Sequence, residues 1–496
     1  MFIAICVIIY LVLLFGVCAL AQKRQNKIIA EGGKASALMA GKNLPLILVI
    51  MFTAGGSIGA ATTTGMAQLA QTAGFSAIWY SLANIVGLLF LGIVGAKRIR
   101  RLGYSTNNEM VADYCGGTAR YLMTIGQLII LLGVGCLQFV SGGAMLAAMF
   151  PGVISANVGI LITAIAFTLI CLFGGLFGTS LANLINVIVL YLGLFICAIV
   201  SINDAGGLSA VFEGMSNLTE STTAGGDWMS LTGGLGLATC LSYMVSEPGN
   251  RITTQSNTAA AAAANSEKNA RIGIVIGALL LLPITLVSLF MGFVAKLNFP
   301  DIPSAQALSA VILSVHPALA AIGMAGLWAV TVSTGIVLLM ASVQVFCYDV
   351  MAPITMRKST LSADEQKKKM DKQSKIVTIA LSALMLFLAY MATGFVATII
   401  TVLCITPAFF WIMLSFLYWP KLIKKSSAVV TQVVAYAFFL AWLFIPAVKE
   451  AFPTPIYVEW PLCTAVWFLC AIFDKRKIDK VVPKSERKLS AGIMED

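Results

Sequence analysis

The chain has 496 residues, of which 59% are hydrophobic and only 11% are charged, and its formal net charge is +11. Because an average soluble domain carries roughly 25% charged residues, this composition excludes a soluble globular protein. Apolar runs of about 17 residues or more, long enough to cross a bilayer, recur along the whole chain. The sequence therefore predicts an all-α polytopic membrane protein. Its basic residues beside the spans are typical of the positive-inside rule rather than of nucleic-acid binding.

About 13 transmembrane helices are predicted, with approximate bounds 2–21, 45–71, 76–96, 121–149, 157–175, 182–202, 229–247, 272–295, 318–348, 376–393, 395–418, 428–447 and 458–473. With the first helix running from outside to inside, the basic clusters fall in inside loops, and only Lys296 and Lys449 fall outside. This bias places the N-terminus outside and the C-terminus inside. The first helix is expected to be a retained span, because its Lys/Arg cluster follows the apolar run instead of preceding it.

The loops between these helices are short. Residues 203–228 are expected to form an extracellular segment, which contains acidic residues and neither Lys nor Arg. The alanine-rich residues 258–264 are expected to form a short amphipathic helix in an inside loop, and residues 357–375 a charged helical linker. The 11 cysteines are assigned to packing, since no outside pair is available for a disulfide.

Only Glu247 and Asp349 are expected among the ionisable residues of the hydrocarbon region, both at the inner ends of their helices. This interior argues against a proton pump with a carboxylate relay, a voltage sensor and an intramembrane enzyme, which need clustered charges or metal ligands. The single His316 lies in an outside loop, without a second nitrogen ligand in the chain. The protein is therefore not expected to be an enzyme.

The second helix has a glycine-rich interruption, with Gly55, Gly56, Gly59 and Gly65 among Ser and Thr residues at mid-membrane depth. One interpretation is a packing face of small residues. The other is an unwound segment whose free carbonyl groups line a cavity. The seventh helix has a similar glycine break at residues 233–236. Two interrupted helices, five spans apart and entering from opposite sides, indicate an inverted repeat.

The ninth helix places two adjacent hydroxyls, Ser333 and Thr334, mid-membrane in an otherwise apolar span. Such hydroxyls often bond back to a carbonyl one turn earlier in the helix. They are also suitable ligands for a hard cation, which prefers oxygen. Together with carbonyls freed by the break in the second helix, they would bind Na⁺ without burying a carboxylate.

The predicted organisation follows from the repeat. It comprises residues 1–44 (peripheral first helix and cytoplasmic loop), 45–202 (first repeat, helices two to six), 203–228 (extracellular loop), 229–418 (second repeat, helices seven to eleven), 419–473 (helices twelve and thirteen) and 474–496 (basic cytoplasmic tail).

Several motifs, in order from the second helix to the twelfth, resemble the sodium:solute symporter family. They are Gly55-Gly56-Ser57 followed by Gly65 and Gly74, the GGL turn at 174–176, Asn250-Arg251 with Ala270-Arg271, Ser333-Thr334 followed by Asp349, and Pro407 with residues 418–421. The resemblance implies the five-plus-five inverted repeat of the leucine-transporter fold. It also implies Na⁺-coupled symport of a solute by alternating access.

A sodium site is implied by the same resemblance. Its ligands would be the backbone carbonyls of Gly55, Ile58 and Val330 and the hydroxyls of Ser333 and Thr334. A second sodium site, present in some relatives, falls here on an amide and two hydrocarbon side chains, namely Asn183, Ile336 and Val337. We therefore expect one Na⁺ per transport cycle.

Substrate contacts are also implied by matching the sugar-transporting branch of the family, namely Thr62, Tyr80, Ser81 and Asn84. Ser81 stands where sugar transporters have a carboxylate, which weakens the case for a sugar. Depth and polarity add Ser57, Tyr243 and Thr406. Because no Arg or Lys is expected to reach the cavity, the solute is expected to be small and neutral, zwitterionic or monocarboxylic.

The sequence thus predicts a Na⁺-coupled importer of the cell membrane. Its expected partners are the solute, the coupling ion Na⁺ and the lipid bilayer, with no obligate protein partner. A proton-coupled or uncoupled transporter of the same fold is the nearest alternative. A passive channel and a solute sensor that needs a signalling partner are the rivals from other classes.

Overall fold

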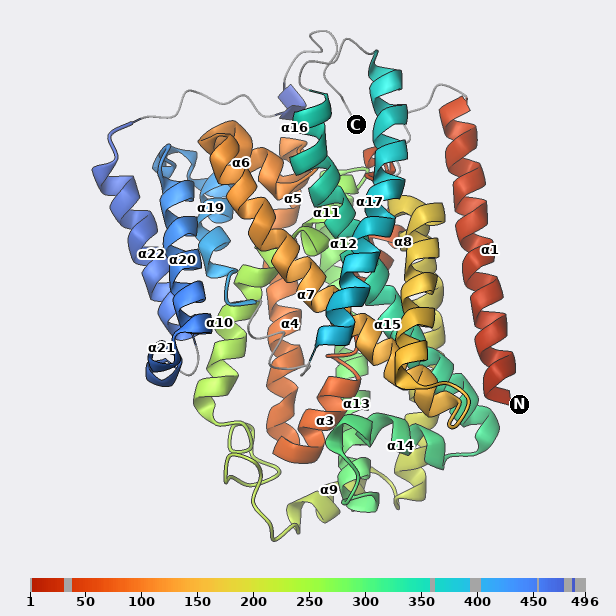
Figure 1. Cartoon of the computed structure of the whole chain (residues 1–496). Coiled ribbons are helices and arrows are strands. Elements are labelled where there is room, and N and C mark those ends of the chain that lie inside the picture. Colours follow the sequence, from red (N-terminus) through yellow and green to blue (C-terminus); the bar gives the residue numbers. More distant parts are fainter. Residues whose placement is uncertain are drawn as a thin grey trace.

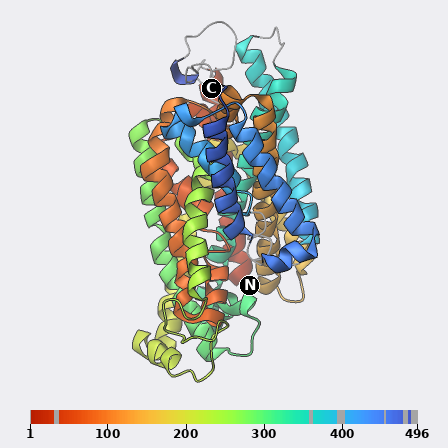
Figure 2. The same cartoon turned by 90° about the vertical axis from the view of Figure 1, so that its left-hand side faces the viewer.

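The structure is a computed structural model that describes residues 2–30, 38–356, 362–392, 403–452, 455–476 and 484–486. These residues are almost entirely helical, and most long helices run roughly along the long axis of the molecule (Figures 1 and 2). Among them, a β-bridge between Leu44 and Ala264 is the one strand-like pairing.

The elements up to residue 216 are α1 (Phe2–Ala30), η1 (Ala40–Lys42), α2 (Leu46–Ser57), α3 (Thr64–Ala73), η2 (Gly74–Ala77), α4 (Ile78–Phe90), η3 (Leu91–Gly95), α5 (Ala96–Leu102), α6 (Asn107–Cys115), α7 (Gly117–Met149), α8 (Ala156–Asp204) and α9 (Leu208–Ser216). The later elements are α10 (Leu237–Thr253), α11 (Gln255–Ala263), α12 (Glu267–Leu279), α13 (Leu281–Asn298), η4 (Ser304–Gln306), α14 (Ala307–Ser314), α15 (Pro317–Val345), η5 (Phe346–Met351), α16 (Ala352–Thr355), α17 (Ala363–Met391), α19 (Pro407–Tyr418), η6 (Pro420–Leu422), α20 (Ser427–Phe444), α21 (Pro446–Ala451), α22 (Ile456–Phe473) and η7 (Lys484–Glu486).

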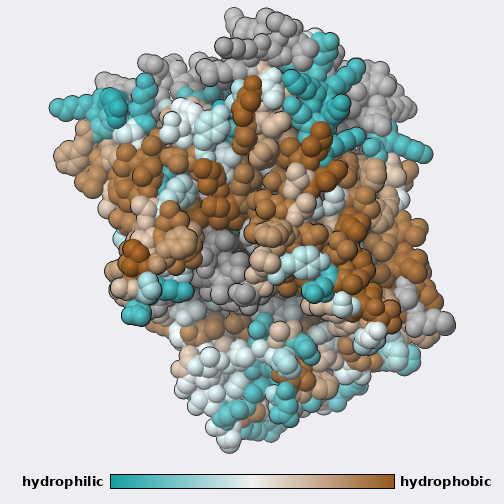
Figure 3. Space-filling model, in the orientation of Figure 1, coloured by the Kyte–Doolittle hydropathy of each residue, from teal (hydrophilic) through white to brown (hydrophobic). Residues whose placement is uncertain are grey.

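A wide apolar belt crosses the face of the molecule in Figure 3, between polar surfaces at its two ends. Within the described residues, nine helices are long and apolar enough to cross a membrane. Large apolar side chains on these helices are exposed, as Phe387 and Phe473 show, and a surface of this kind is stable only against lipid or a partner. The prediction of an all-α polytopic membrane protein is confirmed.

Helix α8 covers two predicted spans, 157–175 and 182–202. A straight helix of its 49 residues would be ~74 Å long, more than twice the ~30 Å of a bilayer's hydrocarbon core. Gly175 breaks it, with φ 53° and ψ −160°, a backbone conformation that residues with a side chain rarely adopt. The predicted turn at 174–176 therefore coincides with a break in the helix.

Two predicted segments fall partly outside the described residues. α19 covers the second half of the predicted span 395–418, and residues 393–402 are not described. α17 joins most of the predicted charged linker to the tenth span, beginning with a capping box between Ser362 and Glu365. Residues 357–361 of that linker, and most of the predicted tail, lie outside the described residues.

The seventh helix differs from the prediction. Residues 229–236 form turns, and α10 runs without interruption from Leu237 to Thr253. The preceding loop packs on the end of α3, where the Phe75 N–H donates to the Trp228 carbonyl at 2.8 Å. The expectation of an interrupted seventh helix is wrong, because these glycines serve close loop packing: a Cβ on Gly234 would lie 1.8 Å from the Ala73 carbonyl oxygen.

The alanine-rich segment is also different from its prediction. All of the alanines from 259 to 264 are buried, because α11 packs among α2, α5 and α15. The bridge from Leu44 holds its end, with the Leu44 N–H donating to the Ala263 carbonyl at 2.9 Å. This segment is a core helix with small side chains, and the expectation of an amphipathic surface helix is wrong.

Helix α15 forms the centre of the protein, and nearly every side chain from Ala320 to Val345 is buried. It is apolar on all sides, which is typical of a fully buried helix. Small residues let α8 approach it: a Cβ on Gly335 would lie 1.8 Å from the Phe167 ring, and one on Gly326 would lie 2.9 Å from the Val189 carbonyl oxygen. The ninth predicted span is therefore the central element that positions the site.

One intramembrane carboxylate was missed by the sequence analysis. Glu459 lies in the first turn of α22, is fully buried, and has no hydrogen-bond partner among the described residues. The statement that only Glu247 and Asp349 lie in the apolar interior is therefore wrong. The 11 cysteines are all free, and all but Cys6 and Cys470 are buried.

Candidate functional site

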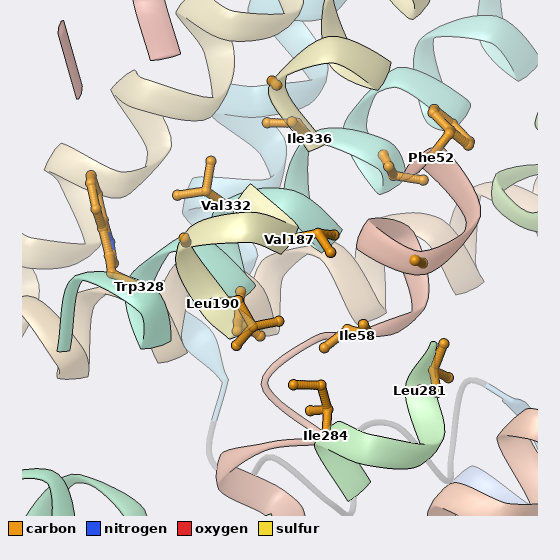
Figure 4. Packing of buried hydrophobic residues seen from close by; sticks show 14 of the residues in the cluster. Phe52, Ile58, Val187, Leu190, Leu281, Ile284, Trp328, Val332 and Ile336 are labelled. Carbon is orange, nitrogen blue, oxygen red and sulfur yellow. The ribbon is translucent and has the colours of Figure 1, made fainter. Parts of the chain in front are cut away.

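The site begins at the break between α2 and α3. Residues 58–63 are not helical, and the Thr62 hydroxyl accepts a hydrogen bond from the Gly59 N–H at 3.0 Å, replacing a helical partner. Backbone groups without helical partners at this depth need other polar groups nearby. Figure 4 shows Ile58 on this link, between Ile284 of α13 and Val187 of α8. Of the two interpretations of this segment, the structure therefore shows the unwound one.

The two hydroxyls of α15 meet the carbonyl oxygens of this break. Thr334 Oγ1 lies 3.0 Å from the Gly55 oxygen and 3.2 Å from the Ile58 oxygen. Ser333 Oγ lies 2.7 Å from the Val330 oxygen and 3.5 Å from the Ile58 oxygen. The structure thus brings all five predicted sodium ligands together. Each hydroxyl has one proton and two lone pairs. The lone pairs of the hydroxyls and the carbonyl oxygens therefore remain available to a cation.

Glycines make this contact between α15 and the break sterically feasible. A Cβ on Gly59 would lie 2.8 Å from Thr334 Oγ1, and a Cβ on Gly56 would lie 3.0 Å from a methyl group of Val337. Any larger residue at position 59 would push the Thr334 hydroxyl away from the carbonyl oxygens. The glycine cluster therefore serves both interpretations of the sequence, close packing and an unwound segment.

The positions that match the second sodium site lie beside this cluster. Asn183 is fully buried, and its side chain would lie 2.6 Å from a Cβ on Gly55. Its oxygen accepts from the Asn186 amide at 3.4 Å, and Asn186 in turn accepts from the Tyr10 hydroxyl at 2.7 Å. Ile336 and Val337 are buried hydrocarbons that supply no oxygen.

A cavity opens from the break toward the junction of α10 and α11. Four predicted substrate contacts line it, and so does Thr334 of the ion cluster; the four are Ser57, Thr62, Tyr80 and Asn84. The Asn84 Oδ1 atom is buried, and no described residue donates a hydrogen bond to it. The cavity therefore shares one residue with the ion cluster and offers a free acceptor to a solute.

Three other predicted substrate residues are not brought to the cavity. Ser81 is fully buried on α4, and its hydroxyl has no hydrogen-bond partner among the described residues. Tyr243 packs edge-on against Tyr80, with ring centroids 5.4 Å apart. The Thr406 hydroxyl donates to the Leu403 carbonyl at 2.7 Å. These three side chains therefore lie outside the cavity lining.

The expectation that no Arg or Lys reaches the cavity is wrong. Arg251 and Glu247 both line it, and the Arg251 Nε donates to a Glu247 oxygen at 2.9 Å. Gly87 of α4 allows α10 this close, because a Cβ there would lie 2.8 Å from the Glu247 backbone and 2.9 Å from Arg251 Cγ. The i,i+4 spacing of Glu and Arg near the end of an apolar helix was the signal that could have found this pair.

The α10–α11 junction forms the floor of the cavity. A buried network of side-chain amides lies behind this floor, and Gln255 is its centre. The Gln255 N–H donates to the Gln127 side-chain oxygen at 3.1 Å, and its own side-chain oxygen accepts from the Asn107 N–H at 3.2 Å. Its amide nitrogen donates to the Ser105 carbonyl at 3.1 Å and to Gln344 at 3.4 Å. The neighbouring Thr254 and Ser256 line the cavity. One residue thus links α6, α7, α15 and the α10–α11 junction.

A carboxylate outside the predicted spans lies in α6, one of the helices that Gln255 contacts. Glu109 in α6 is tied to Lys484 of η7 at 2.8 Å and accepts from the Ser105 N–H at 2.8 Å. Burial by itself would raise the pKa of Glu109, but the charge and hydrogen bond of Lys484, the Ser105 N–H and the charge of Lys42 together outweigh it and hold the pKa below its ordinary value. This pair fastens η7 to the helical bundle.

Solved structures of other transporters share the fold. A substrate-bound, outward-open Na⁺-coupled sialic acid symporter matches with a TM-score of 0.78 and 16% identity, over 97% of this chain and 99% of that one. Mhp1, a nucleobase-cation-symport-1 family transporter, matches with a TM-score of 0.59 and 13% identity over 88% and 93%. MhsT, in complex with L-phenylalanine, matches with a TM-score of 0.54 and 15% identity over 86% and 98%. At these identities the likeness shows a leucine-transporter-like fold.

A protein-family comparison gives the second line of evidence. The model of the Sodium:solute symporter family matches residues 37–433. These residues contain the break, both hydroxyls of α15, and Glu247 and Arg251, which form the charged wall of the cavity. The match covers well over half of the 496 residues. This multi-pass membrane protein therefore belongs to the sodium:solute symporter family, a family of Na⁺-coupled transporters and not of enzymes.

Proposed function

We propose that the protein imports a small organic solute together with one Na⁺, which binds between the α2–α3 break and α15. The observation that carries this proposal is the meeting of the Ser333 and Thr334 hydroxyls with the carbonyl oxygens of Gly55 and Ile58. Five neutral oxygens satisfy a hard cation and still allow its release, because no carboxylate holds it. The hydrocarbon side chains at 336 and 337 support a single ion per cycle.

Coupling follows from the position of Thr334. It belongs to the ion cluster and also lines the cavity, while Ser57 and Thr62 of the break line the same cavity. A bound ion would order the break and so position the solute contacts. The solute would in turn stabilise the ion-bound arrangement, since coupling between two sites is reciprocal. For a solute without net charge, one Na⁺ entering down 100 mV supplies ~2.3 kcal/mol, roughly 50-fold accumulation. A singly charged anionic solute would cancel this electrical contribution, and the Na⁺ concentration gradient alone would then drive its uptake.

The proposed topology completes this picture. We propose 13 spans, with helices two to six and seven to eleven as inverted repeats, the N-terminus outside and the C-terminus inside, in the cell membrane. Basic residues near the α6 end of the bundle, including Arg98, Arg100 and Arg101, support an inside location for that end. The α10–α11 floor of the cavity then faces the cytoplasm.

The first test measures sodium dependence in single-hydroxyl variants. Ser333→Ala and Thr334→Ala should each raise the Na⁺ concentration for half-maximal stabilisation about tenfold or more, because each removes one charge-assisted ligand of ~1.5–3 kcal/mol. Matched controls come from the same helix: Ser342 and Thr331 donate to the Leu338 and Trp328 carbonyls, away from the break. Ser342→Ala and Thr331→Ala should leave the sodium dependence unchanged.

The measurement is thermal unfolding of the purified protein in NaCl or choline chloride, followed by solute uptake into proteoliposomes. Binding to the native state raises the apparent stability by mass action. A Hill coefficient for Na⁺ near one is expected, and a value near two would contradict the single-ion proposal. Equal stabilisation in both salts, strengthened at acid pH, would replace sodium coupling by proton coupling, with Glu247 as the carboxylate at the cavity.

A further inference from the structure

The charged wall of the cavity offers unused hydrogen-bond donors. The Arg251 side chain is 12% exposed and that of Glu247 is 9% exposed, and both line the cavity. A guanidinium group has five N–H donors. Nε donates to Glu247 at 2.9 Å and Nη1 to the Asn257 side-chain oxygen at 3.1 Å, while Nη2 donates to no described residue. The remaining N–H groups on Nη1 and Nη2 form the planar fork that suits a carboxylate.

The charges of the wall indicate the sign of the solute. Among the described residues that line the cavity, Arg251 and Glu247 carry the only formal charges, and they neutralise each other. The proposed Na⁺ beside Thr334 adds one positive charge, which one carboxylate would balance. A doubly charged phosphate would exceed this balance, and an uncharged sugar would leave the positive charge uncompensated in a low-dielectric interior.

An ammonium group would add a further positive charge beside Na⁺ and Arg251, whereas Glu247, the carboxylate among the described lining residues, is already paired with Arg251. One Glu247 oxygen accepts both from Arg251 and from the Asn250 amide at 3.4 Å, so its charge is already engaged. Part of the cavity lining is hydrocarbon, contributed by Ile130, Val134, Leu338 and Leu403. A short aliphatic group fits such a surface.

We propose that the solute is a monocarboxylate with a short hydrocarbon part, and that Arg251 binds its carboxylate. This assignment rests on the proposed Na⁺-coupled symport and specifies its substrate class. Gly87 is part of the arrangement, because its missing side chain allows α10 to bring Arg251 to the cavity. Arg251 therefore determines specificity, and the ion cluster provides coupling.

The test uses defined probes on the full-length purified protein. Acetate, propionate, butyrate, lactate and pyruvate are compared with acetamide, propionamide and butyramide, with L-amino acids, and with sugars and nucleobases. Each is measured by thermal shift in NaCl and in choline chloride. Monocarboxylates should raise the unfolding temperature in NaCl, whereas the matched amides, amino acids and neutral solutes should not.

Variants then test the residue. Removing Arg251 alone would leave the Glu247 charge buried without its partner. The informative variant is therefore the double change Glu247→Gln with Arg251→Gln. It should bind the best monocarboxylate about 30-fold more weakly or worse, and it should respond equally to propionate and propionamide. Arg251→Lys keeps the charge but loses the planar fork, and should bind with intermediate affinity. Arg101→Gln breaks a pair with Glu267 at 2.8 Å on the exposed surface, and should behave as wild type.

Stabilisation by Na⁺ alone shows that each variant is folded and that the ion site is intact. A double variant that still prefers propionate to propionamide would overturn the assignment of Arg251. A wild-type protein stabilised only by amino acids, sugars or nucleobases, or by no carboxylate, would overturn the substrate class. Sodium-dependent hits in those cases would leave the proposed symport intact, whereas carboxylate hits of equal size in choline chloride would contradict sodium coupling and leave the Arg251 assignment in place.

Discussion

Replacing Gly59 by alanine tests whether the contact between α15 and the break forms the ion site. The new Cβ would lie 2.8 Å from Thr334 Oγ1 and 3.2 Å from its methyl group. An ordinary van der Waals contact begins near 3.4 Å, so the hydroxyl has to move by about 0.6 Å, beyond the ~0.2 Å tolerance of a metal–ligand distance. We expect a folding cost of about 1–3 kcal/mol from overpacking.

The sodium dependence should change more than the stability. Displacement of one ligand, at ~1.5–3 kcal/mol, raises the Na⁺ concentration for half-maximal stabilisation about 10-fold to 150-fold. Gly65→Ala is the matched control, because its Cβ would meet only the Ala60 carbonyl oxygen at 3.6 Å. Thermal shift against NaCl titrations measures both variants. An unchanged sodium requirement in Gly59→Ala, with the protein folded, would show that Thr334 is not a ligand.

Two further predictions concern Gly87 at the cavity wall and the Glu109–Lys484 pair. Gly87→Ala, whose Cβ would lie 2.8 Å from the Glu247 backbone, should weaken solute binding at least about tenfold while Na⁺ alone still stabilises the protein. Solute-driven thermal shift measures this, and equal loss of both responses would point to general misfolding. Glu109→Gln should lower the unfolding temperature at pH 7. Because the pKa of Glu109 is depressed in the folded protein, its stabilisation is present above its ordinary pKa and is lost as pH falls through the folded value. The difference from wild type should therefore shrink as the pH falls below the ordinary pKa of a glutamate, about 4.3, and disappear below the lower pKa of the folded protein. A difference independent of pH would contradict the Lys484 pairing.

The break and the hydroxyl pair were predictable because both signals are local. Glycines among hydroxyl residues in an apolar run, and two adjacent hydroxyls in another, each indicate an unusual helix without reference to the rest of the chain. The convergence of Gly55 with Thr334, which are 279 residues apart, came from the family resemblance rather than from either motif alone.

The parts that the sequence did not predict depend on contacts between distant segments. Arg251 reaches the cavity because Gly87 of a different helix admits it. The alanines of α11 are buried because α2, α5, α10, α12 and α15 pack around them. Nothing in an alanine run distinguishes a core helix from a surface one. The glycines at 233–236 support loop packing against Ala73, which a hydropathy pattern does not separate from a helix break.

The amide network around Gln255 has a consequence for temperature. Its hydrogen bonds join the floor of the cavity to α6, α7 and α15, and the amides are almost completely buried. Any rearrangement that opens this floor has to break several of these bonds together before water or new partners replace them, so the step carries a large activation enthalpy. Cooling should then slow turnover steeply while equilibrium binding of ion and solute persists, and the loaded protein would accumulate in one conformation in the cold.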